Sequence, residues 1–410
     1  MKKLAIVSSY SELCGNATYT EALRKNFAKY YDVTVFPLRV KLLEKTDKYF
    51  SYLGDKHIDE IAQSLKEFDF VNIQFEAGLY GVVRYQIYRR LKKLVDSANN
   101  VIVTLHRYDQ KTSYKSKQIL KGLLCLEVRK AVVDFNMSVK QNYFFGLTAK
   151  LIRLFKSKNV ALVVHTKRER ELISVFFGYE RIYDHPISFL TPEELKKYKL
   201  GSDRREIIQK YGLSNDDVLI GIFGFISKYK GHHVIVDAMK YLPDHYKLLI
   251  FGSQHPFSMQ PFYNMDSYIS DLIEKVSFYE RETRKTGKKS FKDRILFCGA
   301  LTDDEFIKAL FMCDFNVLPY YETGQSGSGI ASLTLETGCK AVFSQNYAFL
   351  ELEKYAPGCF KKVGIGNYLE LADSIRFFGE DFSENLNKYY EKYNINTSID
   401  LYKKIFEKII

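Results

Sequence analysis

The 410-residue chain has no tryptophan and only six cysteines, six methionines and eight prolines. The cysteines are scattered and none forms a C-x-x-C pair: Cys14, Cys125, Cys298, Cys313, Cys339 and Cys359. Zinc sites and disulfide frameworks need cysteines at short, regular spacings, so this distribution argues against both. We expect a reducing compartment and a cytoplasmic protein.

Long apolar runs are lacking as well. No run approaches the roughly 20 residues that are needed to cross a bilayer. The apolar part of the opening segment MKKLAIVSSYSE is too short for a signal peptide, and it predicts a first strand instead. The protein is therefore expected to be soluble or to lie at most on a membrane surface.

Several catalytic signatures are missing from the sequence. It has no D-x-D metal motif, no G-x-x-x-x-G-K-[ST] loop, no G-x-S-x-G elbow and no H-E-x-x-H helix, which disfavours metal-dependent single-domain glycosyltransferases, P-loop NTPases, serine hydrolases and zincins. We expect no metal and no cofactor. The net charge of +12 fits either an anionic partner or a lysine-rich composition, and no nucleic-acid-binding signature accompanies it.

What is present is an alternation of short apolar runs and amphipathic segments, repeated in both halves of the chain. This pattern predicts βαβ units around parallel sheets, and the length predicts two domains. The expected strands are Leu4–Ser8, Asp32–Phe36, Phe70–Phe75, Val101–His106 and Ala161–His165, then Val218–Phe223, Lys247–Phe251, Arg294–Phe297, Phe315–Leu318 and Ala341–Ser344. We place an N-terminal Rossmann-like domain at 1–190, a second Rossmann-like domain at 191–385 and a helical segment at 386–410.

The strongest local signal is the segment FGFISKYKGHHVIVDAM, in which a strand ends at Gly224 and a basic turn leads into a helix. Such a turn offers backbone N–H groups to an anion, and a lysine beside it adds a point charge. Lys230 is the favoured residue, with Lys228 second and Ser227 in the same turn. Two exposed lysines in an ordinary loop would give the same pattern.

A second segment, LPYYETGQSGSGIASLTLETGCKAVFS, has a strand, a run of small polar residues and a helix. Glycine lets a ligand approach the backbone closely, and the first N–H groups of the helix favour a diphosphate. A serine N-cap in a flexible loop is the alternative. The residues proposed to bind are Gln325, Ser326, Gly327, Ser328 and Gly329.

Together these two segments resemble those of the retaining GT-B glycosyltransferases of family 4, and the resemblance extends over the whole chain. It implies an α/β GT-B fold, in which two Rossmann-like domains face each other across a cleft that holds the site and the C-terminal helix crosses back to the N-terminal domain. It also implies a nucleotide-diphosphate sugar as co-substrate, bound by Lys230 and the loop amides, with retention of anomeric configuration. The G-x-x-x-x-x-K-G turn of the family corresponds to Gly224–Gly231.

The sequence departs from the family at its acidic pair. Many members carry Glu-x7-Glu, whereas Gln325 and Leu333 occupy those positions here. Glu322 and Glu336 lie nearby, so we take Glu322 as a catalytic candidate and Glu336 as a donor contact. Phe225 replaces the usual arginine of the basic turn.

The resemblance also assigns roles in the N-terminal half. The segment CGNATY resembles the first loop of the family, so Gly15 and Asn16 are expected to contact the donor. The segment QFEAGLYG resembles a Q-x-E-x-G-x-x-G pattern of polysaccharide-building members, which makes Gln74 and Glu76 acceptor candidates. His106 lies at a strand end, where α/β folds bind ligands, and is a catalytic and acceptor candidate or a structural histidine.

The segment Tyr108–Lys158 is rich in lysine and arginine interleaved with apolar residues, as in LTAKLIRLFKSK. A basic amphipathic helix often lies on anionic lipid, and a solvated face of a core helix is the alternative. The resulting hypothesis is a glycosyltransferase of cell-surface polysaccharide or glycolipid synthesis, peripheral on the inner membrane face, that acts on a glycan or lipid-linked acceptor. The alternatives are another GT-B enzyme, such as an epimerase or a phosphorylase, and a non-catalytic binding subunit.

Overall fold

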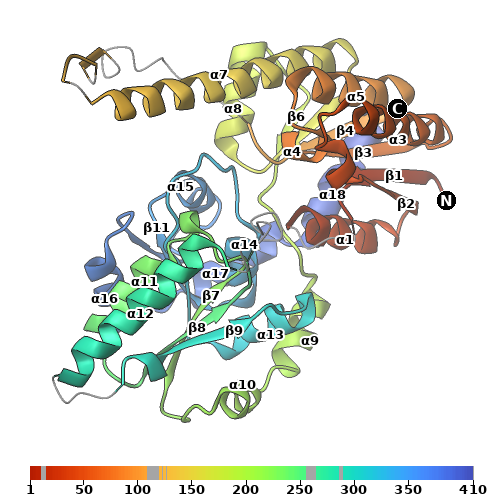
Figure 1. The fold of residues 1–410 in the computed structure, drawn as a ribbon. Coiled ribbons are helices and arrows are strands. Elements are labelled where there is room, and N and C mark those ends of the chain that lie inside the picture. Colours follow the sequence, from red (N-terminus) through yellow and green to blue (C-terminus); the bar gives the residue numbers. More distant parts are fainter. Residues whose placement is uncertain are drawn as a thin grey trace. The chain divides into compact units, whose positions relative to one another are not determined.

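The computed structural model describes residues 1–10, 15–108, 120–121, 123–125, 127–254, 265–285 and 290–409, with the backbone alone at 134, 137–138 and 140–144. The chain forms two compact α/β units. The first consists of Met1–His185 and Ser398–Ile410, and the second of Pro186–Thr397. Each unit contains one parallel six-stranded sheet with helices packed against it (Figure 1).

The sheet of the first unit has the strand order β2-β1-β3-β4-β5-β6. Its central strands are buried on both faces, and β3 is fully buried along its length, which is why the sequence shows them as nearly continuous apolar runs. The strands are β1 Lys3–Ser8, β2 Asp32–Pro37, β3 Phe70–Phe75, β4 Asn100–Leu105, β5 Ala161–Val164 and β6 Ile182–Asp184.

Helices cover both faces of this sheet. Side chains such as Ala5 and Val7 enter a core that α3, α5 and α7 close, whereas Tyr402 of the C-terminal helix reaches Thr104 of β4. The helices are α1 Gly15–Phe27, α2 Val40–Leu43, α3 Lys48–Leu65, α4 Ala77–Tyr80, α5 Arg84–Ser97, α7 Val128–Ser157 and α8 Lys167–Phe177.

The C-terminal helix α18, Ile395–Ile409, returns to the first unit as predicted. Phe406 packs against Phe70 with ring centroids 4.4 Å apart, and Tyr402 meets Phe27 edge to face at 5.5 Å. The hydroxyl of Tyr402 is 2.6 Å from Oγ1 of Thr104. The final helix is therefore part of the first unit's structure, although residues up to Thr397 belong to the second.

The second unit has the strand order β12-β11-β10-β7-β8-β9. Counted from β7, this is the order of a dinucleotide-binding Rossmann sheet, with the order reversing between β7 and β10. Its strands are β7 Val218–Phe223, β8 Tyr246–Phe251, β9 Ile295–Gly299, β10 Phe315–Leu318, β11 Lys340–Ser344 and β12 Lys361–Val363.

Clear start and stop signals bound the helices of the second unit. Thr191 and Thr302 form capping boxes with Glu194 and Glu305, and Gly338 ends a helix in the left-handed conformation. The helices are α9 Pro192–Leu200, α10 Arg204–Tyr211, α11 His232–Ala238, α12 Ser267–Lys285, α13 Asp303–Met312, α14 Gly329–Thr337, α15 Tyr347–Glu353, α16 Tyr368–Arg376 and α17 Ser383–Tyr393, with 3-10 turns η1 Lys228–Lys230, η2 Met239–Tyr241 and η4 Lys292–Arg294.

All ten strands that the sequence predicted are present, with bounds shifted by at most two residues. The two strands it missed, β6 and β12, are three-residue edge strands, too short to show a pattern. In the described part of the chain, no helix is long and apolar enough to cross a membrane.

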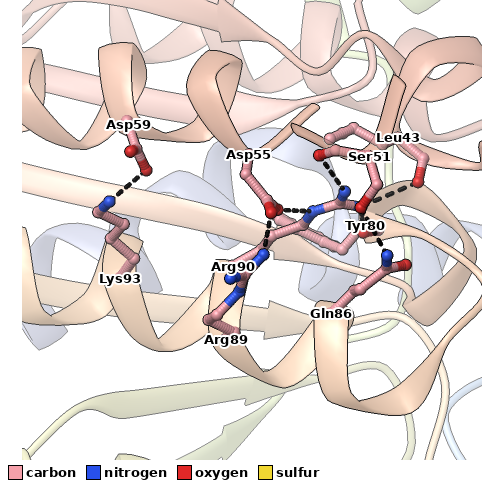
Figure 2. A network of polar contacts seen from close by, with 9 residues as sticks. All are labelled: Leu43, Ser51, Asp55, Asp59, Tyr80, Gln86, Arg89, Arg90 and Lys93. Atoms are coloured by element: carbon pink, nitrogen blue, oxygen red, sulfur yellow. Dashed lines mark hydrogen bonds and ion pairs between the residues drawn. The ribbon is translucent and has the colours of Figure 1, made fainter. Parts of the chain in front are cut away.

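A buried arginine joins the helices on one face of the first unit (Figure 2). The Arg90 side chain of α5 is 1% exposed, and its Nε donates to Asp55 of α3 at 2.8 Å. Its Nη1 donates to the carbonyl oxygens of Leu43 and Tyr80, both at 2.8 Å. Glycine is needed at position 81, where a Cβ would come within 2.9 Å of this guanidinium and φ is +135°. Arg90 thus ties α5 to α3 and to the ends of α2 and α4.

Candidate functional site

In the second unit the polar segments gather where the strand order reverses, at the carboxyl ends of β7 and β10. Ligands of open α/β sheets bind at such a point because the loops there diverge to opposite faces. The turn after β7 packs directly on the segment after β10, since the Tyr321 N–H donates to the Tyr229 carbonyl at 2.7 Å. The two segments that the sequence singled out are therefore neighbours.

Two glycines make this close packing possible. Gly224 has φ +91°, and a Cβ on it would meet the Lys230 ammonium group and the side chain of Ile330. Gly231 has φ +71°, and a Cβ there would overlap the carbonyl oxygen of Pro319. Both positions are in the region of φ that favours glycine. The glycines of the turn therefore set the position of Lys230 beside the second segment.

Lys230 is a buried cation. Only 5% of the residue is exposed, and its Nζ donates to the carbonyl oxygen of Phe223 at 3.2 Å and lies 5.7 Å from the ring centre of Tyr320. No carboxylate of the described residues forms an ion pair with it. Burial lowers its pKa from 10.5 to about 7. Burying a charge without a counter-ion is costly, so this arrangement suits an anionic ligand that supplies the missing charge.

The loop before α14 adds backbone donors on the same side. Ser328 is the N-cap of α14, and its hydroxyl accepts from the Ala331 N–H at 3.4 Å. Gln325 donates its side-chain amide to the Gly327 carbonyl at 3.3 Å, and Ser326 is buried. The N-terminus of a nine-residue helix carries a partial positive charge, which favours phosphate. Ser227, the N-cap of η1, has a buried Oγ with no hydrogen-bond partner among the described residues.

In the structure, the glycines of this loop have a different role from the one that the sequence suggested. A Cβ on Gly327 would lie 3.1 Å from the side chain of Ile187, and one on Gly329 would lie 3.0 Å from Phe189. Both glycines therefore admit side chains of the segment that enters the second unit. Close approach of a ligand to the loop, which the sequence suggested, stays a prediction.

The two glutamates that we proposed as substitutes for the acidic pair bind backbone amides. The Glu336 carboxylate is buried and accepts from the N–H groups of Phe189 and Leu190 at 2.9 and 3.0 Å. Burial raises its pKa to about 8. The exposed Glu322 accepts from Gly324 at 2.6 Å and from Tyr347 at 2.7 Å. Both carboxylates therefore hold the fold, and their roles toward a donor stay predictions.

In the first unit, the equivalent reversal of strand order lies between β1 and β3, and polar side chains gather there too. Gly15 is the exposed first residue of α1, and Asn16 follows it. Nδ2 of Asn16 donates to Oε2 of Glu76 at 2.6 Å. Glu76 is half-buried between β3 and α4, and this bond joins the elements that follow β1 and β3. The structure thus brings together two of the predicted contacts, Asn16 and Glu76.

His106 follows β4 and is half-buried. Its Nε2 lies 2.6 Å from Oε1 of Gln74, and its Nδ1 lies 3.3 Å from Nε2 of His165. The Nδ1–H of His165 donates to the carbonyl of His185 at 3.1 Å. Burial lowers the pKa of His106 well below its usual value and that of His165 to about 4, so both rings are uncharged at neutral pH. The Nε2–H of His106 is engaged by Gln74, and direct contact of this histidine with a ligand stays a prediction.

Three residues that were not predicted from the sequence support this cluster: Asn72, Thr104 and Tyr19. The Gln74 amide reaches Asn72 and lies 3.4 Å from Oγ1 of Thr104, and Tyr19 meets the His106 ring edge to face at 5.7 Å. Asn72, Gln74 and Thr104 are fully buried polar residues. Polar residues at alternate positions of an otherwise apolar strand, as in VNIQF, are a signal that could have identified Asn72.

The two units carry different chemistry. The second offers a buried ammonium group and a helix N-terminus, which suit a phosphate. The first offers uncharged imidazoles, amides and one carboxylate, which suit hydroxyl groups. Among the described residues, no group of three or more histidine, cysteine, aspartate and glutamate side chains could hold a metal ion. Independence of a metal stays a prediction.

Solved structures share this fold over the full length of the chain. HepE from Anabaena, in complex with UDP and glucose, is 13% identical with a TM-score of 0.61, and the match covers 99% of this chain and 100% of that one. A glycosyltransferase from Rickettsia africae is 14% identical with a TM-score of 0.63, covering 100% and 98%. Sucrose-phosphate synthase from Thermosynechococcus elongatus is 13% identical with a TM-score of 0.63, covering 100% of both chains.

No protein-family model matches the sequence, and the comparison with curated proteins found no match. The similarity to the solved structures is therefore one of fold. Two parallel six-stranded sheets with their helices form the α/β architecture of the GT-B glycosyltransferases, as the sequence predicted.

Proposed function

We propose that this protein is a glycosyltransferase that moves a sugar from a nucleotide-diphosphate sugar to a glycan or lipid-linked acceptor, with retention of anomeric configuration, in the synthesis of a cell-surface polysaccharide. The observation that carries the proposal is Lys230, a buried ammonium group without a carboxylate partner among the described residues, beside the N-terminus of α14. A diphosphate matches both features in charge and in hydrogen-bonding capacity.

The chemistry follows from where charge develops. When the bond between the anomeric carbon and the diphosphate oxygen breaks, the electron pair stays on the diphosphate. Lys230 and the N–H groups at the start of α14 stabilise that charge, and they are more effective in a poorly hydrated site than in water. The acceptor hydroxyl forms the new bond to the anomeric carbon, and its proton passes to the departing phosphate. No residue of the chain has to change its protonation state in this route.

The first unit supplies the acceptor contacts in this proposal. The half-buried Glu76 carboxylate accepts a hydrogen bond from the Asn16 amide and is suited to sugar hydroxyls, which both donate and accept hydrogen bonds, whereas Asn16 itself is proposed as a donor contact. The neutral His106 sits behind them in the Gln74 cluster. The fold supports this reading, because structures with the same architecture include HepE with bound UDP and glucose and a sucrose-phosphate synthase.

A thermal-shift panel tests the donor site. The full chain is measured with UDP-, GDP-, ADP-, TDP- and CMP-sugars, and the last of these has a single phosphate and serves as a comparison. We expect one of the diphosphate donors to raise the melting temperature of the wild type at millimolar concentration, because a ligand that binds the native state stabilises it. Lack of a shift with every donor would argue for the alternative, a GT-B relative that does not use nucleotide sugars.

Donor affinity is expected to fall as the pH rises from 7 to 9. The Lys230 pKa is about 7 in the unliganded protein, and a bound diphosphate favours the ammonium form and raises it. The charged form that binds becomes scarcer above pH 7, so the dissociation constant should increase by up to about tenfold per pH unit. Isothermal titration at pH 7, 8 and 9 measures this. The Lys228→Ala variant should show the same dependence of the dissociation constant on pH as the wild type. An affinity of the wild type that does not change with pH would contradict the Lys230 site.

We place the protein on the cytoplasmic side of a membrane. The segment 108–158 contributes a basic helix, α7, whose first half has exposed valines and a phenylalanine beside Arg129 and Lys130; residues 109–119, 122 and 126 lie outside the described part. Anionic lipid attracts such a surface. The second candidate function is a non-catalytic donor-binding subunit, which is favoured by Glu322 and Glu336 having backbone amides as partners.

A further inference from the structure

An exposed apolar patch on the first unit has no role in the proposed reaction. We call it the α3–α5 patch, and it consists of residues at the start of α3 and in and before the first turn of α5. Each is between 38% and 66% exposed. Its members are Tyr49, Phe50, Tyr52, Val82, Val83 and Tyr85. Exposed apolar residues gathered in this way usually mark a surface that another molecule covers.

Hydrogen bonds hold the starts of the two helices that carry the patch side by side. Nε2 of Gln86 donates to Oγ of Ser51 at 2.7 Å, and Nη2 of Arg90 reaches the Ser51 carbonyl at 3.5 Å (Figure 2). The Arg89 guanidinium lies 5.8 Å from the ring centre of Tyr85. The buried Arg90 therefore holds the surface that displays these side chains.

The rim of the patch is positively charged. Lys45, Lys48 and Arg84 are exposed around it. The acidic residues nearby have partners of their own: Glu44 makes an interaction, Asp47 caps α3 by accepting from the Phe50 N–H at 3.0 Å, and Asp55 pairs with Arg89 and Arg90. A second copy of the chain would bring like charges together across a symmetric contact.

The first half of α7 carries a second, separate stretch of exposed apolar residues. Val128, Val132, Phe135 and Val139 are all exposed, and their spacing of four, three and four residues places them on one face of the helix. Further along the same helix, a Cβ on Gly146 would lie 3.0 Å from Nη1 of Arg84, which places α7 against the start of α5.

We infer that the α3–α5 patch docks on a bilayer that contains anionic lipid. Tyrosine has an apolar ring and a polar hydroxyl, and it is enriched at the boundary between headgroups and acyl chains. The basic rim is attracted to anionic headgroups. This inference rests on the proposed function and deepens it: Val82 is six residues after Glu76, so a lipid-linked acceptor held at this surface would present its sugar near the acceptor contacts.

Sedimentation of the full chain with vesicles tests the docking surface. The vesicles are phosphatidylcholine alone or phosphatidylcholine with one third phosphatidylglycerol. The patch variant is Tyr49→Ser/Tyr52→Ser/Tyr85→Ser. Its control is Val175→Ser/Phe176→Ser, which replaces two apolar side chains of α8 that are 80% and 71% exposed and lie outside the patch. All five positions are exposed, so both variants should fold, and an unchanged melting temperature checks this.

We expect the wild type and the control to bind the anionic vesicles, with binding weakened by salt, and the patch variant to partition at least about tenfold less, the loss of roughly 1.4 kcal/mol. Equal binding of the wild type and the patch variant to the vesicles would overturn the inference. A further variant, Val132→Ser/Phe135→Ser in α7, is measured alongside, and the inference would also be overturned if this variant alone lost vesicle binding. A wild type that ignores vesicles but forms dimers that the patch variant lacks would also overturn it. None of these outcomes affects the donor-induced rise in melting temperature that tests the Lys230 site. The two proposals can therefore fail separately.

Discussion

Replacing Lys230 by methionine is expected to weaken binding of the nucleotide-diphosphate sugar about 100-fold while making the unliganded protein more stable. The variant loses a charge-assisted contact in a buried site, which is worth about 3 kcal/mol. It also removes a buried cation that has no carboxylate partner among the described residues. Removing that cost should raise the melting temperature by roughly 5 °C.

The size of the stability effect depends on pH. The Lys230 pKa is lower in the folded protein, about 7, than the 10.5 of a free lysine, so burial costs most below pH 7, where both states are charged. The cost disappears as the pH rises toward 10. The gain in melting temperature from Lys230→Met should therefore be larger at pH 6.5 than at pH 9. Lys228→Met, which alters the exposed lysine of the same turn, should leave stability and affinity nearly unchanged.

A lower stability of the Lys230→Met protein at pH 6.5, with donor affinity retained, would contradict this account. It would mean that the ammonium group is satisfied within the chain. Differential scanning fluorimetry and isothermal titration on the same preparations distinguish the two cases.

Replacing Arg90 by alanine is expected to destabilise the first unit by about 3–5 kcal/mol. The variant leaves the Asp55 carboxylate without its buried partner and the carbonyl oxygens of Leu43 and Tyr80 without a donor (Figure 2). It also opens a cavity where one of the largest fully buried side chains was. Urea unfolding of the full chain measures the loss as a lower midpoint.

Arg89→Ala is the matched control. Arg89 pairs with the same Asp55 from the next position of α5, but half of its side chain is exposed. Exposed ion pairs contribute less than about 1 kcal/mol, so this variant should unfold close to the wild type. Equal losses for the two arginines would contradict the structural role assigned to Arg90.

Arg90 and Lys230 show how much of the structure could be predicted from the sequence. The segment YRRLKK gives no sign that Arg90 is buried and Arg89 exposed, because that difference arises from the packing of α3 against α5 and from the space left at Gly81. The role of Lys230 could be proposed from its turn because strand, glycine and helix follow one another within a few residues. The burial of Lys230, on which the proposal rests, depends on Pro319 and Tyr320, about 90 residues further along the chain.

The fold was more predictable than the contacts of the site. Strands that are buried along their length, such as β3 and β10, appear as apolar runs, and ten of the twelve strands in the described part of the chain were predicted. The glycines of the loop 325–329 were predicted to admit a ligand, but the structure shows Ile187 and Phe189 packed against them. Nothing local in the sequence indicates that Glu336 binds the backbone at Phe189 and Leu190, which are almost 150 residues away.

The most direct test of the proposed transferase activity is the fate of the donor itself. The wild type and the Lys230→Met variant are incubated with the donor that the thermal-shift panel identifies and with a membrane extract as the source of acceptor, and the nucleoside diphosphate released is quantified by phosphorus NMR. We predict release by the wild type and at least about 100-fold less by the variant, the counterpart of the roughly 3 kcal/mol lost in binding. A donor that binds tightly and is recovered intact would contradict the account and establish the chain as a binding subunit.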